Sequence, residues 1–382
     1  MEIKCLFVGD FAPCRSFESL VLKKKTEVAG EALSFIQYAD LSFTNLECPL
    51  TLQHEAINKS GPALKAKPDC VEALKPFSVI GLANNHILDY GKKGLKDTLQ
   101  TCKEAGLPTV GAGLDLDAAQ QPFIQEVKGI KLAIIAVAEH EFNQSESGGA
   151  GSAPIELIDN YQQIKQAKQH ADIVIVTLHG GNEYFPYPRP GLRKICQHYI
   201  DLGVEAVICH HPHVPGAYEY YQGKPIVYSL GNFIFDATKP PIDWELGYMA
   251  QLNFDQENKK FYSLELIPYK QSVELGGVKL LHGHEKDAFL TRIETYRHKL
   301  ENNQAWLDEW QAFVKKQADS YILRHFFPAT FRGLGFLARK TPIGKLFFNR
   351  RNSLPKLNML RCQSHRELLT AALESNSQPR ND

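Results

Sequence analysis

Three histidines stand within four residues at the end of an apolar run. Residues 207–215 read VICHHPHVP, so His210, His211 and His213 follow the apolar letters directly. Imidazole binds metal ions, exchanges protons near neutral pH, or lies buried beside a hydrogen-bonded partner. A single histidine most often has the last of these roles, whereas three so close together favour a functional site. That interpretation depends on whether other segments place suitable partners in an equivalent position.

Five predicted strands end in an acid, an amide or a histidine. The residues at these ends are, in chain order, Asp10, Asn45 and Glu47, Asn84 to His86, His179, and the histidines of 210–213. In an open α/β sheet the carboxyl ends of the strands line the ligand crevice, so these side chains can converge. Oxygen and imidazole ligands together suit Mn, Fe or Zn. Each residue alone could be a cap, a turn residue or a core histidine, but five equivalent coincidences favour a metal site.

Strand–helix alternation over the first 210 residues predicts the scaffold. Strands are expected at 4–9, 41–46, 77–83, 131–138, 172–178 and 205–210, and helices at 27–38, 68–75, 91–105, 156–170 and 190–202. Alternation at this spacing indicates an α/β layered fold with largely buried central strands. Residues 217–230 and 247–269 each alternate about a polar turn, which predicts two hairpins.

The C-terminal part has a different character. Residues 284–320 are predicted to form one long helix, and residues 321–361 carry nine Lys or Arg and no Asp or Glu, with Phe and Leu between them. Such a segment can be a solvated basic face that packs by its apolar side, or an amphipathic segment that meets anionic lipid or a polyanion. We therefore expect one domain at 1–270 and a mostly helical, basic extension at 280–382.

The composition indicates a globular protein, and its balanced net charge favours neither an acidic nor a basic partner. The 382 residues include 43 Lys or Arg and 43 Asp or Glu. The start resembles no signal peptide, and no stretch approaches the ~20 apolar residues of a membrane span, so we expect a cytoplasmic protein. The eight cysteines form no CxxC pair and are interpreted as buried thiols. No nucleic-acid-binding module is recognisable, and nucleic acid is not an expected partner.

Several segments together resemble one family. The motifs GD, NLE, ANNHILDYG, HGGNEY, HPHV and SLGNFIFD follow one another between about residues 3 and 238. In this order they resemble the CapA family of capsule and poly-γ-glutamate synthesis proteins. That family is similar to the calcineurin-like metallophosphoesterases, of which it resembles a divergent branch. The resemblance implies a layered β-sandwich flanked by helices, with one or two divalent metal ions at the strand ends.

The metallophosphoesterase pattern implies a role for each residue that matches it. The implied metal ligands are Asp10, Glu47, Asn85, His179, His211 and His213. One ion would have Glu47, Asn85, His179 and His211, and the other would have Asp10, Glu47 and His213. Ala12 stands where the opening Asp-x-His motif has its histidine, so the second ion has fewer ligands. His86 would give a proton to the leaving group. Glu183 would position a water or accept a hydrogen bond from a ligand imidazole, or be solvated.

Other polar residues near these motifs have supporting interpretations. Asp89 is expected to cap the helix that begins at Gly91. Asn232 and Asp236 are expected to support a ligand or form a turn. The aromatic and proline-rich loop at 184–190 is expected either to wall the site or to pack against the core.

Two functions fit these observations. The first is a metal-dependent hydrolase that acts on a phosphoester, or on a bond in a capsular or exopolymer product or its precursor. The second is a non-catalytic assembly or regulatory factor for a membrane-bound polymer synthase, with the basic tail docked on the inner face of the membrane. Ala12 favours the second function, and the retained Asn85, His86, His211 and His213 favour the first. A serine-triad hydrolase is disfavoured because the chain has no GxSxG motif.

Overall fold

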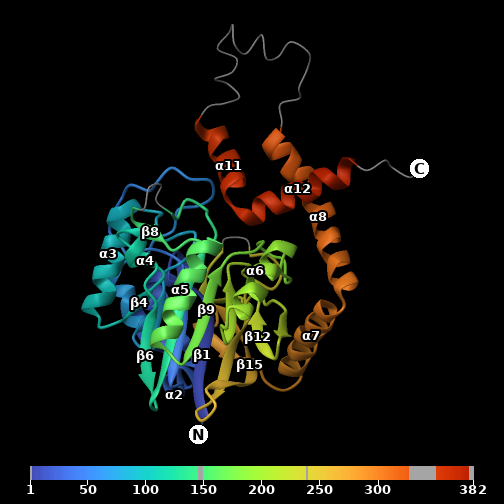
Figure 1. The fold of residues 1–382 in the computed structure, drawn as a ribbon. Coiled ribbons are helices and arrows are strands. Elements are labelled where there is room, and N and C mark those ends of the chain that lie inside the picture. Colours follow the sequence, from blue (N-terminus) through green and yellow to red (C-terminus); the bar gives the residue numbers. More distant parts are fainter. Residues whose placement is uncertain (1, 145–148, 238–239, 327–349, 378–382) are drawn as a thin grey trace.

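Two β-sheets packed face to face form the centre of the molecule. The computed structural model describes residues 2–144, 149–237, 240–326 and 350–377 (Figure 1). Within them the first sheet has the strand order β16-β15-β14-β1-β2-β3-β4, with β13 also paired to β1, and the second has the order β11-β12-β10-β9-β7-β6. A short pair, β5 (Ala112–Gly113) and β8 (Gly151–Ser152), lies beside them.

The strands of the first sheet are β1 (Glu2–Ala12), β2 (Leu41–Leu46), β3 (Val79–Gly81), β4 (Thr109–Val110), β13 (Asn232–Phe235), β14 (Leu246–Asp255), β15 (Lys260–Ser272) and β16 (Gly277–Leu280). Those of the second are β6 (Phe123–Val127), β7 (Ile130–Ala138), β9 (Ile173–His179), β10 (Ala206–His210), β11 (Tyr218–Tyr221) and β12 (Lys224–Val227). Strands β1, β2 and β3 run parallel, as do β7, β9 and β10, so their carboxyl ends share one edge of the sandwich.

Strand β1 shows why its sequence is apolar throughout. Ile3, Cys5 and Phe7 pack between the two sheets, whereas Leu6 and Val8 pack under the helices of the outer face. Successive side chains of a strand point to opposite faces, so a strand covered on both sides needs apolar residues at every position. The predicted α/β layered sandwich with flanking helices is confirmed.

Helices cover both outer faces of the sandwich. The first sheet is covered by α1 (Ser16–Lys24), η1 (Lys25–Ala29), α2 (Ala32–Tyr38), η2 (Pro68–Leu74) and α3 (Gly91–Glu104), and the second by α5 (Leu157–His170) and α6 (Pro190–Asp201), with the short α4 (Leu116–Ala119) between. The predicted helix at 27–38 is wrong in part, because Gly30 at φ 52° separates η1 from α2. The segment predicted as a helix at 68–75 is a 3₁₀-helix.

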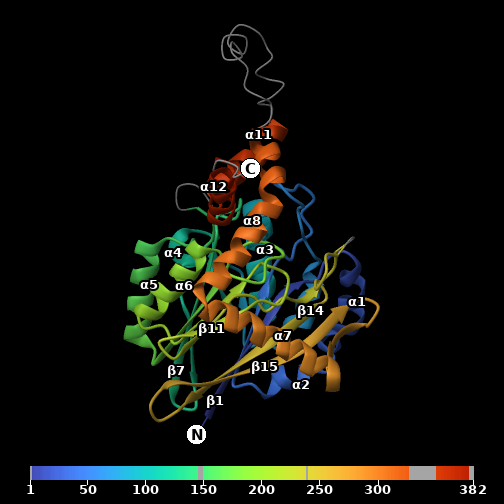
Figure 2. The ribbon, with the colours of Figure 1, turned by 90° about the vertical axis from the view of Figure 1, so that its right-hand side faces the viewer.

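The C-terminal helices reach back over the carboxyl ends of the strands. They are α7 (Gly283–Glu301), α8 (Asn303–Phe326), α11 (Arg350–Arg361) and α12 (Gln363–Ser377). Figure 2 shows α8 rising along the second sheet toward α11 and α12. The single long helix predicted at 284–320 is wrong, because Asn302 is extended (φ −94°, ψ 97°). Its side chain accepts hydrogen bonds from the backbone N–H groups of Gln304 and Ala305, which starts α8 as a new helix.

Part of the predicted basic tail lies outside the described residues. Arg332, Arg339, Lys340 and Lys345 belong to this part, whereas α11 contains the four basic residues from Arg350 to Arg361. No helix of the described chain is both long enough and apolar enough to span a bilayer. All eight cysteines are buried and free, as predicted. The division into domains at 1–270 and 280–382 stays a prediction.

Candidate metal centre

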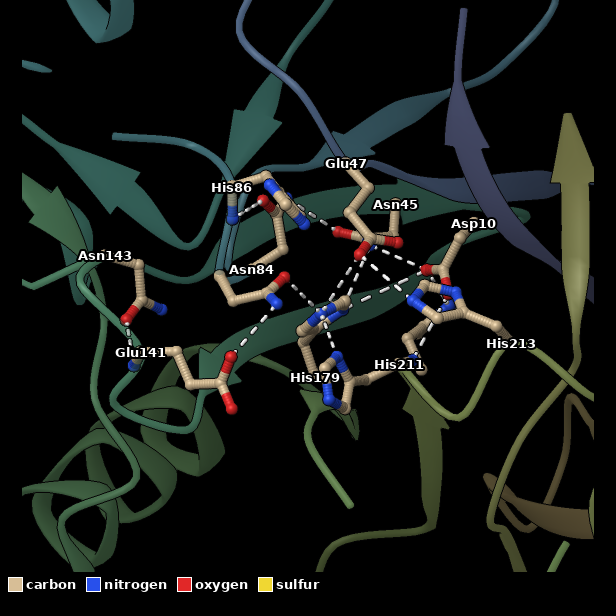
Figure 3. Close-up of polar contacts among 12 residues, drawn as sticks. Asp10, Asn45, Glu47, Asn84, His86, Glu141, Asn143, His179, His211 and His213 are labelled. Atoms are coloured by element: carbon tan, nitrogen blue, oxygen red, sulfur yellow. Dashed lines mark hydrogen bonds and ion pairs between the residues drawn. The ribbon is translucent and has the colours of Figure 1, made fainter. Parts of the chain in front are cut away.

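The six predicted ligands converge at one edge of the sandwich. Figure 3 labels five of them, namely Asp10, Glu47, His179, His211 and His213. They come from the strand ends of both sheets: Asp10 on β1, Glu47 directly after β2, Asn85 in the turn after β3, His179 at the end of β9, and His211 and His213 after β10. Each is at most 7% exposed. The register brings neighbouring strand ends level, because Asp10 pairs with Asn45 and His179 pairs with His210. The sequence-based grouping of strand ends therefore agrees with their positions in space.

One group of ligand atoms surrounds the ring of His179. Its Nε2 lies 3.1 Å from Asn85 Oδ1, 3.1 Å from His211 Nδ1 and 3.6 Å from Glu47 Oε1. An imidazole nitrogen carries at most one proton, so it cannot hydrogen-bond to all three atoms together. Lone pairs from carboxylate, amide and imidazole that point at one place fit a divalent cation.

A second group shares Glu47 with the first. The ligand atoms of Asp10, Glu47 and His213 lie within 4.8 Å of one another. His213 Nδ1 is 3.6 Å from Asp10 Oδ2, and its Nε2 is 3.6 Å from Glu47 Oε1. Ala12 is fully buried on β1 and offers no ligand atom. Glu47 is thus placed between two groups of donors, one richer in ligands than the other.

The carboxylate of Glu47 is buried without a hydrogen bond from the described part of the chain. The residue is fully buried, and neither carboxylate oxygen has a hydrogen-bond partner among the described residues. Burial, with the nearby charge of Asp10, raises the pKa of Glu47 well above its usual range. A buried carboxylate without hydrogen bonds is strongly unfavourable unless a cation compensates its charge. Of the whole centre, this feature fits a bound metal ion best.

Asp10 is held in the ionised form by its neighbours. Burial alone would raise the pKa of Asp10, but the nearby imidazoles of His210 and His213 outweigh burial and hold it well below its usual range. Asn45 Nδ2 donates to Asp10 Oδ1 at 2.7 Å, and the backbone N–H of His211 donates to Oδ2 at 3.2 Å. His210 Nδ1 lies 3.2 Å from Oδ1, so the histidine that is not a predicted ligand supports Asp10.

The HPH segment has a strained backbone. His211 has φ 100° and His213 has φ 59°, in the left-handed region that non-glycine residues rarely adopt. Such conformations cost about 1–3 kcal/mol each and cluster at functional sites. Asn232 holds the second of them, because its Oδ1 lies 2.9 Å from His213 Nδ1 and its Nδ2 donates to the carbonyl oxygen of His213 at 3.2 Å. Asn232 thus contacts the predicted ligand His213, and its role in supporting a metal ligand stays a prediction.

His86 belongs to a charged network rather than to the group of ligands. The prediction that Asp89 caps the following helix is wrong, because the N-cap residue is Tyr90 and no side chain caps it. Instead Asp89 Oδ2 lies 2.6 Å from His86 Nδ1, and Asp89 Oδ1 accepts from Lys59 Nζ at 2.6 Å. Burial and the Lys59 charge lower the pKa of His86, and Asp89 opposes them. Because Asp89 occupies Nδ1, proton exchange with a bound molecule falls to Nε2. In the sequence, the spacing of three residues between His86 and Asp89 is the feature that could have indicated this contact.

A pocket of about 390 Å³ opens onto the centre. Its floor includes Asn85, His86 and His211, and Glu183 stands on its wall with an exposed side chain. The predicted roles of Glu183 toward water or a ligand imidazole stay predictions. The aromatic loop contributes Tyr184 to the lining of the pocket. The same loop packs against the core, because Phe185 stacks on a phenylalanine of α8 with 4.4 Å between the ring centroids.

Two residues of this site gave no signal in the sequence. Glu141 follows β7 in an irregular segment, and its Oε2 accepts a hydrogen bond from Asn85 Nδ2 at 3.3 Å. Its Oε1 lies 2.9 Å from Nε2 of His365 on α12. Neither residue ends an apolar run, and they come from opposite halves of the chain.

Comparison with known proteins assigns this chain to a family. The model of the bacterial capsule synthesis protein PGA_cap family matches residues 4–237, a span that contains all six predicted ligands. This chain belongs to that family. The resemblance to CapA proteins is thereby confirmed. Residues 238–382, which include the C-terminal helices, lie beyond the matched span.

Individual PGA_cap relatives are similar over part of their length. The capsule biosynthesis protein CapA of Bacillus anthracis is 33% identical over 247 residues, which cover 62% of this chain and 60% of that protein. The PGA biosynthesis protein CapA of Bacillus subtilis (strain 168) is 35% identical over 243 residues, which cover 60% of this chain and 62% of that protein. The chain therefore spans about three fifths of the length of these curated relatives.

Solved structures resemble the chain more distantly. The calcineurin-like phosphoesterase YfkN from Bacillus subtilis aligns with a TM-score of 0.44 and 13% identity, covering 69% of this chain and 90% of that chain. A putative 5'-nucleotidase from Staphylococcus aureus aligns with a TM-score of 0.45 and 17% identity, covering 77% of this chain and 58% of that chain. The assignment to the PGA_cap family depends on the sequence match alone.

Proposed function

We propose that this PGA_cap protein is a metal-dependent hydrolase of a phosphoester, or of a bond in a capsular or exopolymer product or its precursor. The observation that supports it most is the buried, unpartnered carboxylate of Glu47 between two groups of ligands. The place of action we propose is capsule or poly-γ-glutamate biosynthesis, since the similar proteins of Bacillus anthracis and Bacillus subtilis have these names.

Mn, Fe and Zn are the proposed metals, because the ligand set mixes carboxylate and amide oxygens with imidazole nitrogens. Glu47, Asn85, His179 and His211 would hold one ion, and Asp10, Glu47 and His213 would hold a second. A bound divalent ion polarises the electrophile and lowers the pKa of a bound water. The protein excludes bulk solvent from these groups, since all of them are buried.

The proton to the leaving group is assigned to His86. Its ring lies in the pocket beside Asn85, and Asp89 fixes its orientation through Nδ1. The Lys59 ammonium, 2.6 Å from Asp89 and with a side chain 5% exposed, compensates the carboxylate. A positioned acid of this kind typically contributes about 10²–10⁴-fold to a rate.

A second candidate function is supported by Ala12. With no histidine there, the group of Asp10, Glu47 and His213 has three members. A centre with one weak ion position also fits a non-catalytic assembly or regulatory factor for a membrane-bound polymer synthase. Location in the cytoplasm, with contact to the membrane or the synthase through the basic tail, belongs to this second proposal.

Turnover by the purified full chain tests the proposal. The protein is incubated with Mn, Fe or Zn and with p-nitrophenyl phosphate or bis(p-nitrophenyl) phosphate. We expect metal-dependent release of nitrophenol that Asn85→Ala abolishes and that His86→Ala lowers by about 10²-fold or more. His284→Ala, at an exposed histidine of α7, is the matched control and should retain full activity. No turnover by the wild type, together with normal polymer production by cells carrying His86→Ala, would refute the hydrolase and favour the assembly factor.

A further inference from the structure

The C-terminal helices form a roof over the metal centre. Phe313 of α8, Asn358 and Met359 of α11, and His365 of α12 line the same pocket as Asn85. Figure 1 shows α11 and α12 above the carboxyl ends of the strands. These residues lie outside the span that matches the family. The roof is therefore a feature of this chain that the family match does not describe.

Buried charges tie this roof to the sandwich. The guanidinium of Arg189, 3% exposed, donates to Glu139 Oε1 at 2.7 Å and to Ser364 Oγ at 3.0 Å, and it also pairs with Glu367 of α12. Glu139 Oε2 accepts from the backbone N–H of Ser364 at 3.2 Å. Removing one member of a buried, hydrogen-bonded ion pair is strongly destabilising. Helix α12 is thus held in one position relative to the loops that follow β7 and precede α6.

A chain of contacts runs from α12 to a predicted ligand. His365 Nε2 lies 2.9 Å from Glu141 Oε1, and Glu141 Oε2 accepts from Asn85 Nδ2 at 3.3 Å. The backbone N–H of Glu141 donates to Asn143 Oδ1 at 2.8 Å, which fixes the segment that carries this carboxylate. The other end of the Asn85 amide, Oδ1, points at His179 Nε2 at 3.1 Å.

This chain of contacts decides which end of the Asn85 amide faces the ligands. An amide group offers an acceptor at one end and a donor at the other, and an ionised carboxylate accepts only. The carboxylate of Glu141 therefore selects the orientation in which Nδ2 faces Glu141 and Oδ1 faces the other ligand atoms.

The contacts of Cys362 indicate a hydrogen bond rather than another metal ligand. Its sulfur lies within 4.8 Å of ligand atoms of Glu141 and His365. The thiol Sγ donates a hydrogen bond to Glu139 Oε2 at 3.4 Å. A metal ligand would have to be the thiolate.

We propose that Glu141 and His365 are positioning residues for the ligand Asn85, and that the C-terminal roof is in this way part of the metal centre. The inference depends on the metal binding proposed above. Residues that orient a metal ligand typically change the affinity by about 10–100-fold when they are replaced. The ion held by Glu47, Asn85, His179 and His211 should respond, whereas the ion held by Asp10 and His213 should not.

Calorimetric titration of metal-free full-length protein with Mn²⁺ tests this assignment. We expect His365→Ala to weaken one Mn²⁺ binding event by about 10–100-fold and to leave any other unchanged. His365→Gln keeps an N–H donor toward Glu141 and should recover most of the affinity. Arg366→Ala replaces the exposed neighbour on α12 and should bind like the wild type. Thermal melts of the metal-free variants show whether each one folds.

A double-mutant cycle separates positioning from general damage. Glu141→Gln should cause the same loss by itself, and adding His365→Ala to it should cost little more, because both act through one contact. Equal Mn²⁺ affinity of the wild type and Glu141→Gln would overturn the inference even if His365→Ala fails to fold. The inference would also be overturned if His365→Ala lowered the Mn²⁺ affinity as much in the Glu141→Gln background as it does in the wild type. If the wild type binds no Mn²⁺, the proposed function fails, which is a different result from an unaffected variant.

Discussion

Replacing Glu47 with glutamine should make the protein more stable than the wild type without metal and less stable than the wild type with metal. In metal-free protein the buried carboxyl group of Glu47 has no hydrogen-bond partner among the described residues, and it lies near the charge of Asp10. Glutamine has nearly the same shape, carries no charge and can donate to the Asp10 carboxylate. The substitution should therefore stabilise the metal-free protein. It should also remove the ligand that both groups share, so that added metal stabilises the variant little.

The size of both effects follows from general values. A buried polar atom without a partner costs about 1–3 kcal/mol, so relief of one carboxylate oxygen raises the free energy of unfolding by about 2 kcal/mol. For 382 residues the entropy of unfolding is about 0.8 kcal/mol/K, and 2 kcal/mol then shifts Tm by about 2–3 °C. An ion at 100 times its Kd adds about 2.7 kcal/mol, so two ions raise the Tm of the wild type by about 7 °C.

Differential scanning calorimetry in EDTA and in saturating Mn²⁺ measures both quantities. We expect Glu47→Gln to melt about 2–3 °C above the wild type in EDTA and about 4–5 °C below it in Mn²⁺. Glu126→Gln makes the same substitution at an exposed position of β6 and should follow the wild type under both conditions. A Glu47→Gln protein that is less stable than the wild type in EDTA would refute the idea of an uncompensated carboxylate. An unchanged wild-type Tm on adding metal would refute the metal centre.

Two further substitutions test the networks around the centre. Asp89→Asn removes the charge that holds His86 Nδ1 and should lower kcat on nitrophenyl phosphates by on the order of 10²-fold. The Mn²⁺ affinity measured by calorimetry should not change. An unchanged kcat would exclude His86 as the positioned acid. Arg189 holds the pKa of Glu139 below its usual value despite burial, so the stability from this pair is fully present above about pH 5 and is lost as the pH falls through the lowered pKa. Denaturant unfolding of wild type and Glu139→Gln should differ by about 3 kcal/mol at pH 7 and progressively less in acid, and a difference that does not depend on pH would contradict this reading.

Local patterns in the sequence were sufficient to predict where the strands end and which polar side chains stand at those ends. Strands β2, β9 and β10 are short segments rich in apolar and β-branched residues, and Glu47, His179 and His211 stand at or directly after their carboxyl ends. Parallel strands bring such residues together whatever the details of packing. The layered fold and the convergence of these side chains could therefore be predicted, whereas the choice of six ligands among them came from the family resemblance and stays a prediction.

Contacts between distant segments could not be predicted. Glu141 and His365 meet only because α12 folds back over the sandwich, and no periodicity reports such a contact. The role of Asp89 was misassigned because a helix start five residues after His86 made capping the simpler explanation. The break at Asn302 was missed since Glu301-Asn302-Asn303 contains neither glycine nor proline, and the break depends on the backbone of Asn302 and on its capping side chain.

Metal stoichiometry tests the central claim most directly. Elemental analysis of the purified full chain, after incubation with Mn, Fe and Zn and removal of free metal, is made on the wild type and on His211→Ala side by side. The structure predicts one to two ions per chain in the wild type and at least one fewer in His211→Ala, because His211 is a proposed ligand of the richer group. A wild type that retains no ion with any of the three metals would contradict the account, and the converging side chains would then be a buried polar cluster without the proposed metal.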